Sequence, residues 1–77
     1  MVAEQQPLAS FFCPISMVLM TDPVSCCDGN TYERSSIETW LQLHPSSPLT
    51  GACLPSKQLV PNFALRSAIQ EWKEQHA

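Results

Sequence analysis

Residues 12–41 read FCPISMVLMTDPVSCCDGNTYERSSIETWL, and this stretch decides the fold. The segment 11–20, which overlaps the start of this stretch, is apolar and contains Pro14. Its apolar residues do not recur at a regular period of two or of 3.6 residues. That pattern predicts a loop packed against the core. The segments 24–26 and 31–33 then flank Asp28-Gly29, a turn pair that favours positive φ and closes antiparallel strands. A short hairpin is therefore expected.

The residues that follow the hairpin predict a helix over 36–43. Ser35 and Glu38 match the spacing of a capping box, in which the serine hydroxyl accepts an amide of the first turn and the glutamate reaches back. Apolar side chains then recur at helical spacing, namely Ile37, Trp40 and Leu41. Pro45 and Pro48 end this helix and begin a second loop, 45–53.

The last third of the chain, which contains LVPNFALRSAIQEW at 59–72, predicts one more strand and one more helix. A short strand near Leu59 can join the hairpin, and Asn62 is a good N-cap. The apolar stripe of the final helix is Leu65, Ala68, Ile69 and Trp72. The expected fold is α+β: two loops, a three-stranded antiparallel sheet, a central helix and a C-terminal helix, with one domain over 11–77 after a flexible leader, 1–10.

The four cysteines of this 77-residue chain do not fit a zinc framework. Two tetrahedral zinc ions need eight ligands, whereas the chain has four Cys and two His. No C-x-x-C pair exists, and the adjacent Cys26 and Cys27 would point in opposite directions on a strand. We therefore expect no metal, and we interpret Cys13, Cys26 and Cys53 as small apolar core residues.

Composition excludes several classes of partner. The net charge is −3, with four Lys and Arg against seven Asp and Glu, so the chain lacks the basic patch of a nucleic-acid-binding protein. No apolar run approaches the about 18 residues of a membrane span. Residues 1–10 lack the basic start and apolar centre of a secretory signal. An intracellular protein, cytoplasmic or nuclear, with reduced thiols is expected.

No arrangement of residues in the sequence indicates catalysis by the chain itself. No histidine lies in a motif beside a cysteine, no glycine-rich phosphate loop is present, and no His-Glu metal pair lies on a helix. We therefore predict no catalytic residues and no cofactor.

Several short pieces of the sequence, taken in order, resemble the U-box, the metal-free relative of the RING finger that recruits ubiquitin-conjugating enzymes. The pieces are Cys13-Pro14-Ile15, MTDPV (20–24), DGNTYER (28–34), Ile37 with Trp40-Leu41, PLT (48–50), and LVPN (59–62) followed by Leu65 and Ile69. The resemblance implies a ubiquitin ligase domain that holds a ubiquitin-charged conjugating enzyme, without a covalent intermediate of its own, while a substrate lysine attacks the thioester.

The resemblance also assigns residues. It implies contacts to the conjugating enzyme by Ile15, Met17, Trp40, Leu41 and Pro48, although Trp40 and Leu41 also suit the core. It implies a polar network in place of metal, for which we select Asp22, Asp28, Arg34 and Glu38. Gly51 stands where many active members carry an arginine or another polar residue that contacts both conjugating enzyme and ubiquitin.

Three matters stay open at the level of sequence. A non-catalytic module could keep the fold and bind a conjugating enzyme, or another protein, without activating transfer. A thiol relay through Cys26, Cys27 or Cys53 is disfavoured, because no activating histidine or acid is near them in sequence. The resemblance further implies that substrates bind outside this chain and that a homodimer could form, with Phe63 or Trp72 as candidate contacts.

Overall fold

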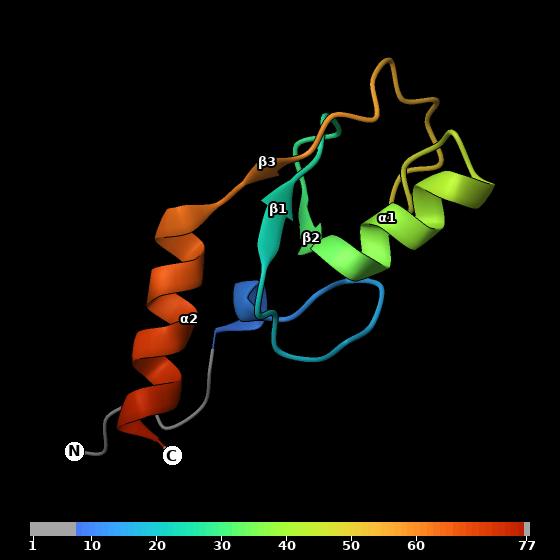
Figure 1. Ribbon diagram of the computed structural model, residues 1–77. Coiled ribbons are helices and arrows are strands. Elements are labelled where there is room, and N and C mark those ends of the chain that lie inside the picture. Colours follow the sequence, from blue (N-terminus) through green and yellow to red (C-terminus); the bar gives the residue numbers. More distant parts are fainter. Residues whose placement is uncertain (1–7, 77) are drawn as a thin grey trace.

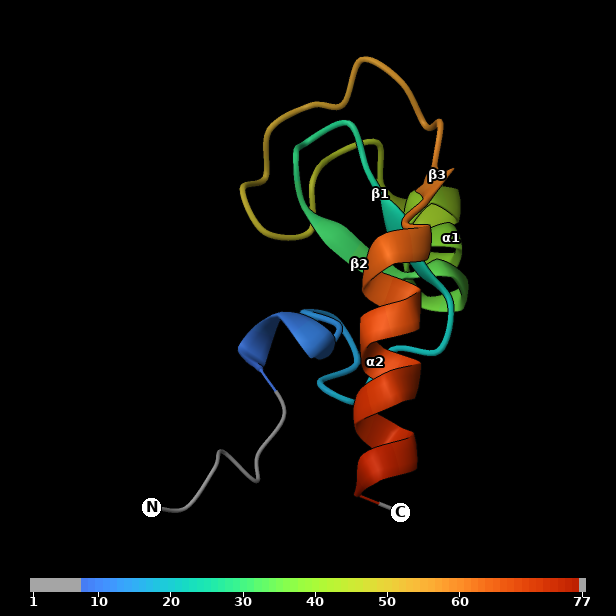
Figure 2. The same cartoon turned by 90° about the vertical axis from the view of Figure 1, so that its left-hand side faces the viewer.

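The computed structural model describes residues 8–76 and shows the expected α+β architecture. The elements in order are η1 (Ala9–Phe11), β1 (Pro23–Ser25), β2 (Thr31–Glu33), α1 (Arg34–Leu43), β3 (Val60–Pro61) and α2 (Phe63–Gln75). Figures 1 and 2 show the strands between the two helices. Residues 1–7 of the predicted leader lie outside the described residues, whereas Ala9 and Ser10 belong to η1.

The sheet has the strand order β2-β1-β3, and both pairings are antiparallel. Val24 lies opposite Tyr32 in the hairpin, and Ser25 lies opposite Val60 of the third strand. The predicted hairpin is confirmed, with β1 one residue earlier than expected. Cys26 leaves the strand because its carbonyl accepts the N–H of Gly29 at 3.0 Å, and Gly29 adopts the positive φ (85°) that the turn requires.

The predicted capping box at the start of α1 is wrong. The helix begins at Arg34, the N-cap residue is Glu33, and no side chain caps it. The Arg34 N–H instead donates to the Asp22 carbonyl at 3.0 Å, which ties the first helical residue to the residue just before β1. Ser35 therefore lies inside the first turn, where its carbonyl accepts the Thr39 hydroxyl at 2.9 Å.

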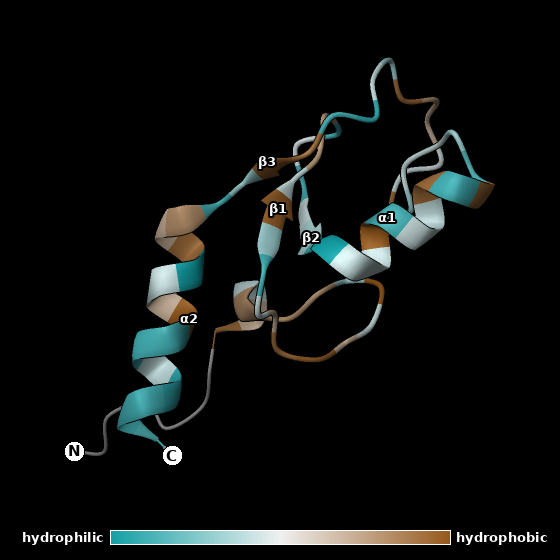
Figure 3. Cartoon of the chain, in the orientation of Figure 1, coloured by the Kyte–Doolittle hydropathy of each residue, from teal (hydrophilic) through white to brown (hydrophobic). Residues whose placement is uncertain are grey.

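The C-terminal helix starts as the sequence predicts and buries one stripe. The N–H of Leu65 donates to the Asn62 side chain at 3.1 Å, which confirms the N-cap. Ile69 is buried, and Leu65 and Trp72 pack against the core. Ala68 is exposed, contrary to its place in the predicted stripe. Figure 3 shows the C-terminal half of this helix mostly hydrophilic, although Trp72 in that half packs against the core.

The core joins the first loop, the hairpin and both helices. Its buried side chains are Phe11, Cys13, Met20, Val24, Cys26, Tyr32, Ile37, Leu41 and Ile69. Burying one side chain the size of Ile37 stabilises the fold by about 1.5 to 3 kcal/mol.

The four cysteines are all free thiols, and two of them are core residues. Cys13 and Cys26 are buried as expected, whereas the prediction for Cys53 is wrong. Cys53 is exposed because the second loop returns over the surface through a bridge between Ser46 and Cys53.

Within residues 8–76, no group of three or more His, Cys, Asp or Glu side chains could hold a metal ion. The same residues contain no helix with the length and hydrophobicity of a membrane span.

Candidate functional site

The first loop, residues 12–20, is a narrow turn closed by its own backbone. Phe12 and Leu19 form an antiparallel bridge at its base. Inside it, the Cys13 N–H donates to the Val18 carbonyl at 3.0 Å, and the Met17 N–H donates to the Cys13 carbonyl at 2.8 Å. Met17 takes a φ of 63°, which costs a side-chain-bearing residue about 1 to 2 kcal/mol. The loop is thus held in one shape at its tip.

The sulfur of Cys13 anchors this loop from below. The side chain is fully buried, and Sγ accepts the N–H of Glu33 at 3.3 Å. Burial alone would raise the pKa of the Cys13 thiol, but hydrogen bonds from Ser16, Glu33 and Ile15 lower it overall. The backbone of the loop and of β2 therefore wraps one sulfur atom, which fixes the loop against the sheet.

The second loop is closed around the Ser47 side chain. Ser47 is 1% exposed, and its hydroxyl accepts the N–H groups of Leu49 at 3.2 Å and Thr50 at 3.1 Å. The Gly51 N–H donates to the Ser47 carbonyl at 3.0 Å. The same hydroxyl donates to Asp28 Oδ2 at 2.6 Å, so one serine both shapes the loop and binds it to the hairpin turn.

The carboxylate of Asp28 collects hydrogen bonds from three parts of the fold. Besides Ser47, it accepts the hydroxyl of Tyr32 at 2.7 Å and the N–H of Asn30 at 2.9 Å. Burial raises the pKa of Asp28, but the bonds from Ser47, Tyr32 and Asn30 outweigh it and hold that pKa below the ordinary value. Burial and the Asp28 carboxylate raise the pKa of Tyr32. Both groups therefore keep their bonded forms at neutral pH.

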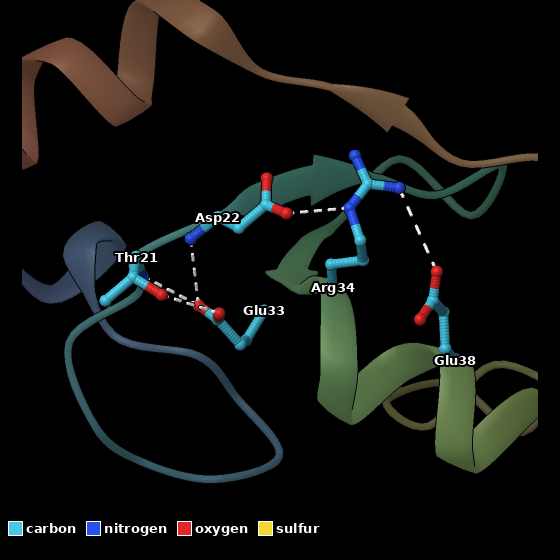
Figure 4. Close-up of polar contacts among 5 residues, drawn as sticks. All are labelled: Thr21, Asp22, Glu33, Arg34 and Glu38. Carbon is cyan, nitrogen blue, oxygen red and sulfur yellow. Dashed lines mark hydrogen bonds and ion pairs between the residues drawn. The ribbon is translucent and has the colours of Figure 1, made fainter.

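A second polar cluster ties the end of the first loop to the start of α1 (Figure 4). Arg34 Nε lies 2.7 Å from Asp22 Oδ2, and Arg34 lies 3.9 Å from Glu38. Glu33 accepts the Thr21 hydroxyl at 2.9 Å and the backbone N–H groups of Thr21 at 2.8 Å and Asp22 at 3.3 Å. The side chains of Asp22, Arg34 and Glu38 are partly exposed, so their ion pairs contribute little to stability. We infer that the cluster mainly fixes the orientation of the loop.

The four predicted network residues thus fall into two clusters. Asp28 belongs to one, and Asp22, Arg34 and Glu38 belong to the other, where Glu38 makes the longest contact. The selected set missed Glu33, Tyr32 and Ser47, which make hydrogen bonds of 2.8, 2.7 and 2.6 Å respectively in these two clusters. Ser47 offered a signal, because a serine before Pro48 in a loop suits backbone closure.

The predicted contact residues divide between surface and core. Ile15 and Pro48 are half-buried in the two loops, and Met17 is 71% exposed. Trp40 is half-buried, and its indole N–H donates to the Ser46 carbonyl at 2.6 Å. Leu41 is only 6% exposed and packs in the core, so it supports this surface from beneath and offers almost no area to a partner.

Three exposed apolar residues beside these positions were not in the predicted set. Val18 follows Met17 in the first loop, Leu49 follows Pro48 in the second, and Leu43 lies in the last turn of α1. They are 58%, 52% and 74% exposed respectively. Leu43 could have been recognised from sequence, because it lies three residues after Trp40 and away from the Ile37–Leu41 stripe.

Gly51 lies at the end of the second loop with a φ of 76°. It is exposed, and a Cβ added there would meet no heavy atom within 4 Å. A side chain at this position would therefore find space but would strain the backbone by about 1 to 2 kcal/mol.

The described surface thus consists of two hydrogen-bonded loops beside a short helix, with apolar side chains exposed on all three. Among residues 8–76 the arrangement holds no metal-binding group, and exposed apolar side chains gathered on one face are typical of protein interaction surfaces.

Comparison with known proteins gives matches over almost the whole chain. Residues 9–77 match the U-box domain family. The chain is 48% identical over 75 residues to U-box domain-containing protein 70 of Oryza sativa subsp. japonica, covering 96% of this chain and 9% of that protein. It is 57% identical over 63 residues to U-box domain-containing protein 37 of Arabidopsis thaliana, covering 80% of this chain and 16% of that protein.

A third relative, U-box domain-containing protein 35 of Arabidopsis thaliana, is 46% identical over 68 residues, covering 88% of this chain and 8% of that protein. The chain therefore spans at most about a sixth of the length of these relatives. The family match and these identities agree with the fold, and the chain belongs to the U-box family.

Proposed function

We propose that this domain acts as a ubiquitin ligase module that binds a ubiquitin-charged conjugating enzyme and promotes transfer of ubiquitin to a substrate lysine. Membership in the U-box family supports ubiquitin ligase function in general. The observation that carries the proposal is the pair of hydrogen-bonded loops that hold the exposed Met17 and the half-buried Ile15 and Pro48 beside Trp40 of α1.

The chemistry of this role needs no group on the domain to react. The thioester belongs to the conjugating enzyme, and the attacking amine belongs to the substrate. What the domain supplies is orientation, which converts a loosely tethered ubiquitin into one held for attack. Loops closed by hydrogen bonds to Ser47 and Cys13 suit this task, because a preformed surface loses little conformational freedom on binding.

A non-catalytic interaction module is the second candidate, and Gly51 is the observation that favours it. Without a side chain, this position makes no contact that bridges conjugating enzyme and ubiquitin. The domain would then bind the conjugating enzyme but leave the thioester in its unreactive arrangements. We favour the ligase with modest basal activity over the inert module.

Two measurements on the same sample separate these candidates. NMR titration with uncharged conjugating enzymes should shift the signals of Ile15, Trp40 and Leu49, and leave those of Arg66 on α2 unchanged. Discharge of the charged enzyme onto free lysine should then accelerate. Binding without acceleration would select the inert module. No binding to any conjugating enzyme of a panel would refute the ligase and leave only a module that binds another protein.

We further propose that substrates are recruited by other parts of a longer protein, that the domain can pair with a second copy, and that it acts in the cytoplasm or nucleus. Light scattering of the purified domain tests the pairing, and fluorescence imaging of the tagged full-length protein tests the location.

A further inference from the structure

The charged residues of the domain are unevenly placed. Residues 11–20 and 39–56 contain no Asp, Glu, Lys or Arg. Within residues 8–76, every such side chain falls in 21–38 or 57–74. The two uncharged segments are the first loop and the second half of α1 with the second loop. The surface expected to hold the partner is therefore free of formal charge.

The uncharged segments also contain four of the seven large hydrophobic residues that are exposed among the described residues. Met17, Val18, Leu43 and Leu49 are each more than half exposed. Among ionisable groups, these segments hold only His44, whose ring lies 4.1 Å from the ring of Trp40, and the thiols of Cys13 and Cys53. Figure 3 shows the first loop, beside α1, in mostly apolar colours.

The other side of the same helix is charged. A groove of about 490 Å³ lies there between α1 and the segment before β3, and its lining includes Arg34, Glu38, Gln42 and Lys57. Arg34, Glu38 and Gln42 follow each other at four-residue intervals, so they share one side of the helix. Trp40 and Leu43 are three residues apart and share another side of the helix. One short helix thus separates a charged face from an uncharged one.

We propose that the face formed by Ile15, Met17, Trp40, Leu43, Pro48 and Leu49 selects conjugating enzymes whose contacting surface is itself apolar and uncharged. This inference rests on the proposed function and states which partner that site accepts. An acidic or basic side chain pressed onto this face loses its water and gains no ion partner, a cost that rejects such enzymes. Selectivity comes from this exclusion and not from attraction between charges.

The first test is the salt dependence of binding. Uncharged contacts are not screened, so the Kd for the tightest-binding enzyme of a panel should change less than about twofold between 50 and 500 mM NaCl. A change of tenfold or more would overturn the proposal while leaving ligase function intact. Failure of every panel member to bind at any salt would refute the proposed function itself, and the selectivity with it.

The second test compares two variants, each of which adds one positive charge to a different side of α1. Leu43→Lys places it on the uncharged face, and Gln42→Lys places the same charge on the neighbouring residue of the charged groove. Both positions are exposed, so both variants should fold, as circular dichroism can check. Leu43→Lys should weaken binding at least about tenfold and Gln42→Lys less than about twofold.

A third variant, Leu43→Gln, separates charge from lost apolar area. It removes the leucine without adding charge, so its loss of affinity should be clearly smaller than that of Leu43→Lys. Equal affinities for Leu43→Lys and Gln42→Lys, or equal losses for Leu43→Lys and Leu43→Gln, would show that charge exclusion does not govern the choice of partner.

Discussion

Ser47 donates a hydrogen bond of 2.6 Å to Asp28, which joins the second loop to the hairpin turn 19 residues earlier in the chain. The serine is buried, and its oxygen also closes the loop backbone at Leu49 and Thr50. Within residues 8–76 no disulfide and no group able to hold a metal ion links the loops, so a fold this small needs such a bond. We therefore assign this pair the main part in holding the second loop.

Replacing Ser47 by alanine should destabilise the domain by about 1 to 3 kcal/mol, because the variant leaves Asp28 and two loop amides short of a partner in a partly buried place. Urea unfolding measures the loss. Ser46→Ala is the matched control, since among the described residues the structure gives the Ser46 hydroxyl no hydrogen bond. Equal midpoints for the two variants would contradict the role of Ser47.

The lowered pKa of Asp28 predicts a loss of stability in acid. A carboxyl whose pKa is depressed by folding contributes stability above its unfolded pKa of about 3.9, and this contribution disappears as the pH falls through the folded value. Unfolding free energies measured from pH 7 down to pH 2 should therefore fall more steeply in the parent than in Asp28→Asn. Asp28→Asn should be less stable than the parent at pH 7. If the free energies of unfolding of the two proteins fell in parallel with pH, the lowered pKa of Asp28 would be contradicted.

The regular elements were predictable because their signals are local. Asp28-Gly29 marks the hairpin turn, Asn62 caps α2, and the Ile37–Leu41 pair marks the buried side of α1. The start of α1 was mispredicted because a contact between distant residues, from the Arg34 amide to the Asp22 carbonyl, replaced the local cap. Propensity and capping patterns do not contain such long-range terms.

Ile15→Ala should reduce ubiquitin discharge strongly while costing less stability than a core truncation. Ile15 is half-buried, so truncation removes exposed contact area together with some packing. Ile37, which is fully buried, is the control, and Ile37→Ala should lose about 2 to 5 kcal/mol. Discharge by folded Ile15→Ala at the parent rate would place the binding surface elsewhere.

Gly51→Arg tests whether a missing side chain limits activity. Gly51 has a positive φ, so any side chain at this position strains the loop. Gly51→Arg and Gly51→Ala should therefore each lose about 1 to 2 kcal/mol of stability. The guanidinium has open space to extend into, and it should raise the discharge rate above that of Gly51→Ala. Bridging interactions of this kind are on the order of 1 to 3 kcal/mol, or about 5- to 150-fold. Identical discharge rates for the two variants would show that a side chain contacting both conjugating enzyme and ubiquitin does not limit activity.

The sequence predicted the positions of the candidate contact residues only in part. Met17 is exposed and Ile15 and Pro48 are half-buried, because prolines and loop hydrogen bonds hold both loops at the edge of the core. For Leu41 the sequence left core and contact open, and the structure buries it because adjacent helical residues differ by about 100° in direction, which turns Leu41 inward beside a half-buried Trp40. Pairings such as Ser47 with Asp28 and Glu33 with Thr21 depend on how distant segments meet, and the sequence does not contain that information locally.

The most direct test of the central claim is single-turnover discharge of a purified, ubiquitin-charged conjugating enzyme onto free lysine, followed on non-reducing gels with and without the domain. The account predicts faster loss of the thioester for at least one enzyme of a panel, weaker acceleration by Ile15→Ala, and no ubiquitin on the domain at any time. Unchanged discharge across the panel, or a reducible ubiquitin adduct on the domain, would contradict it.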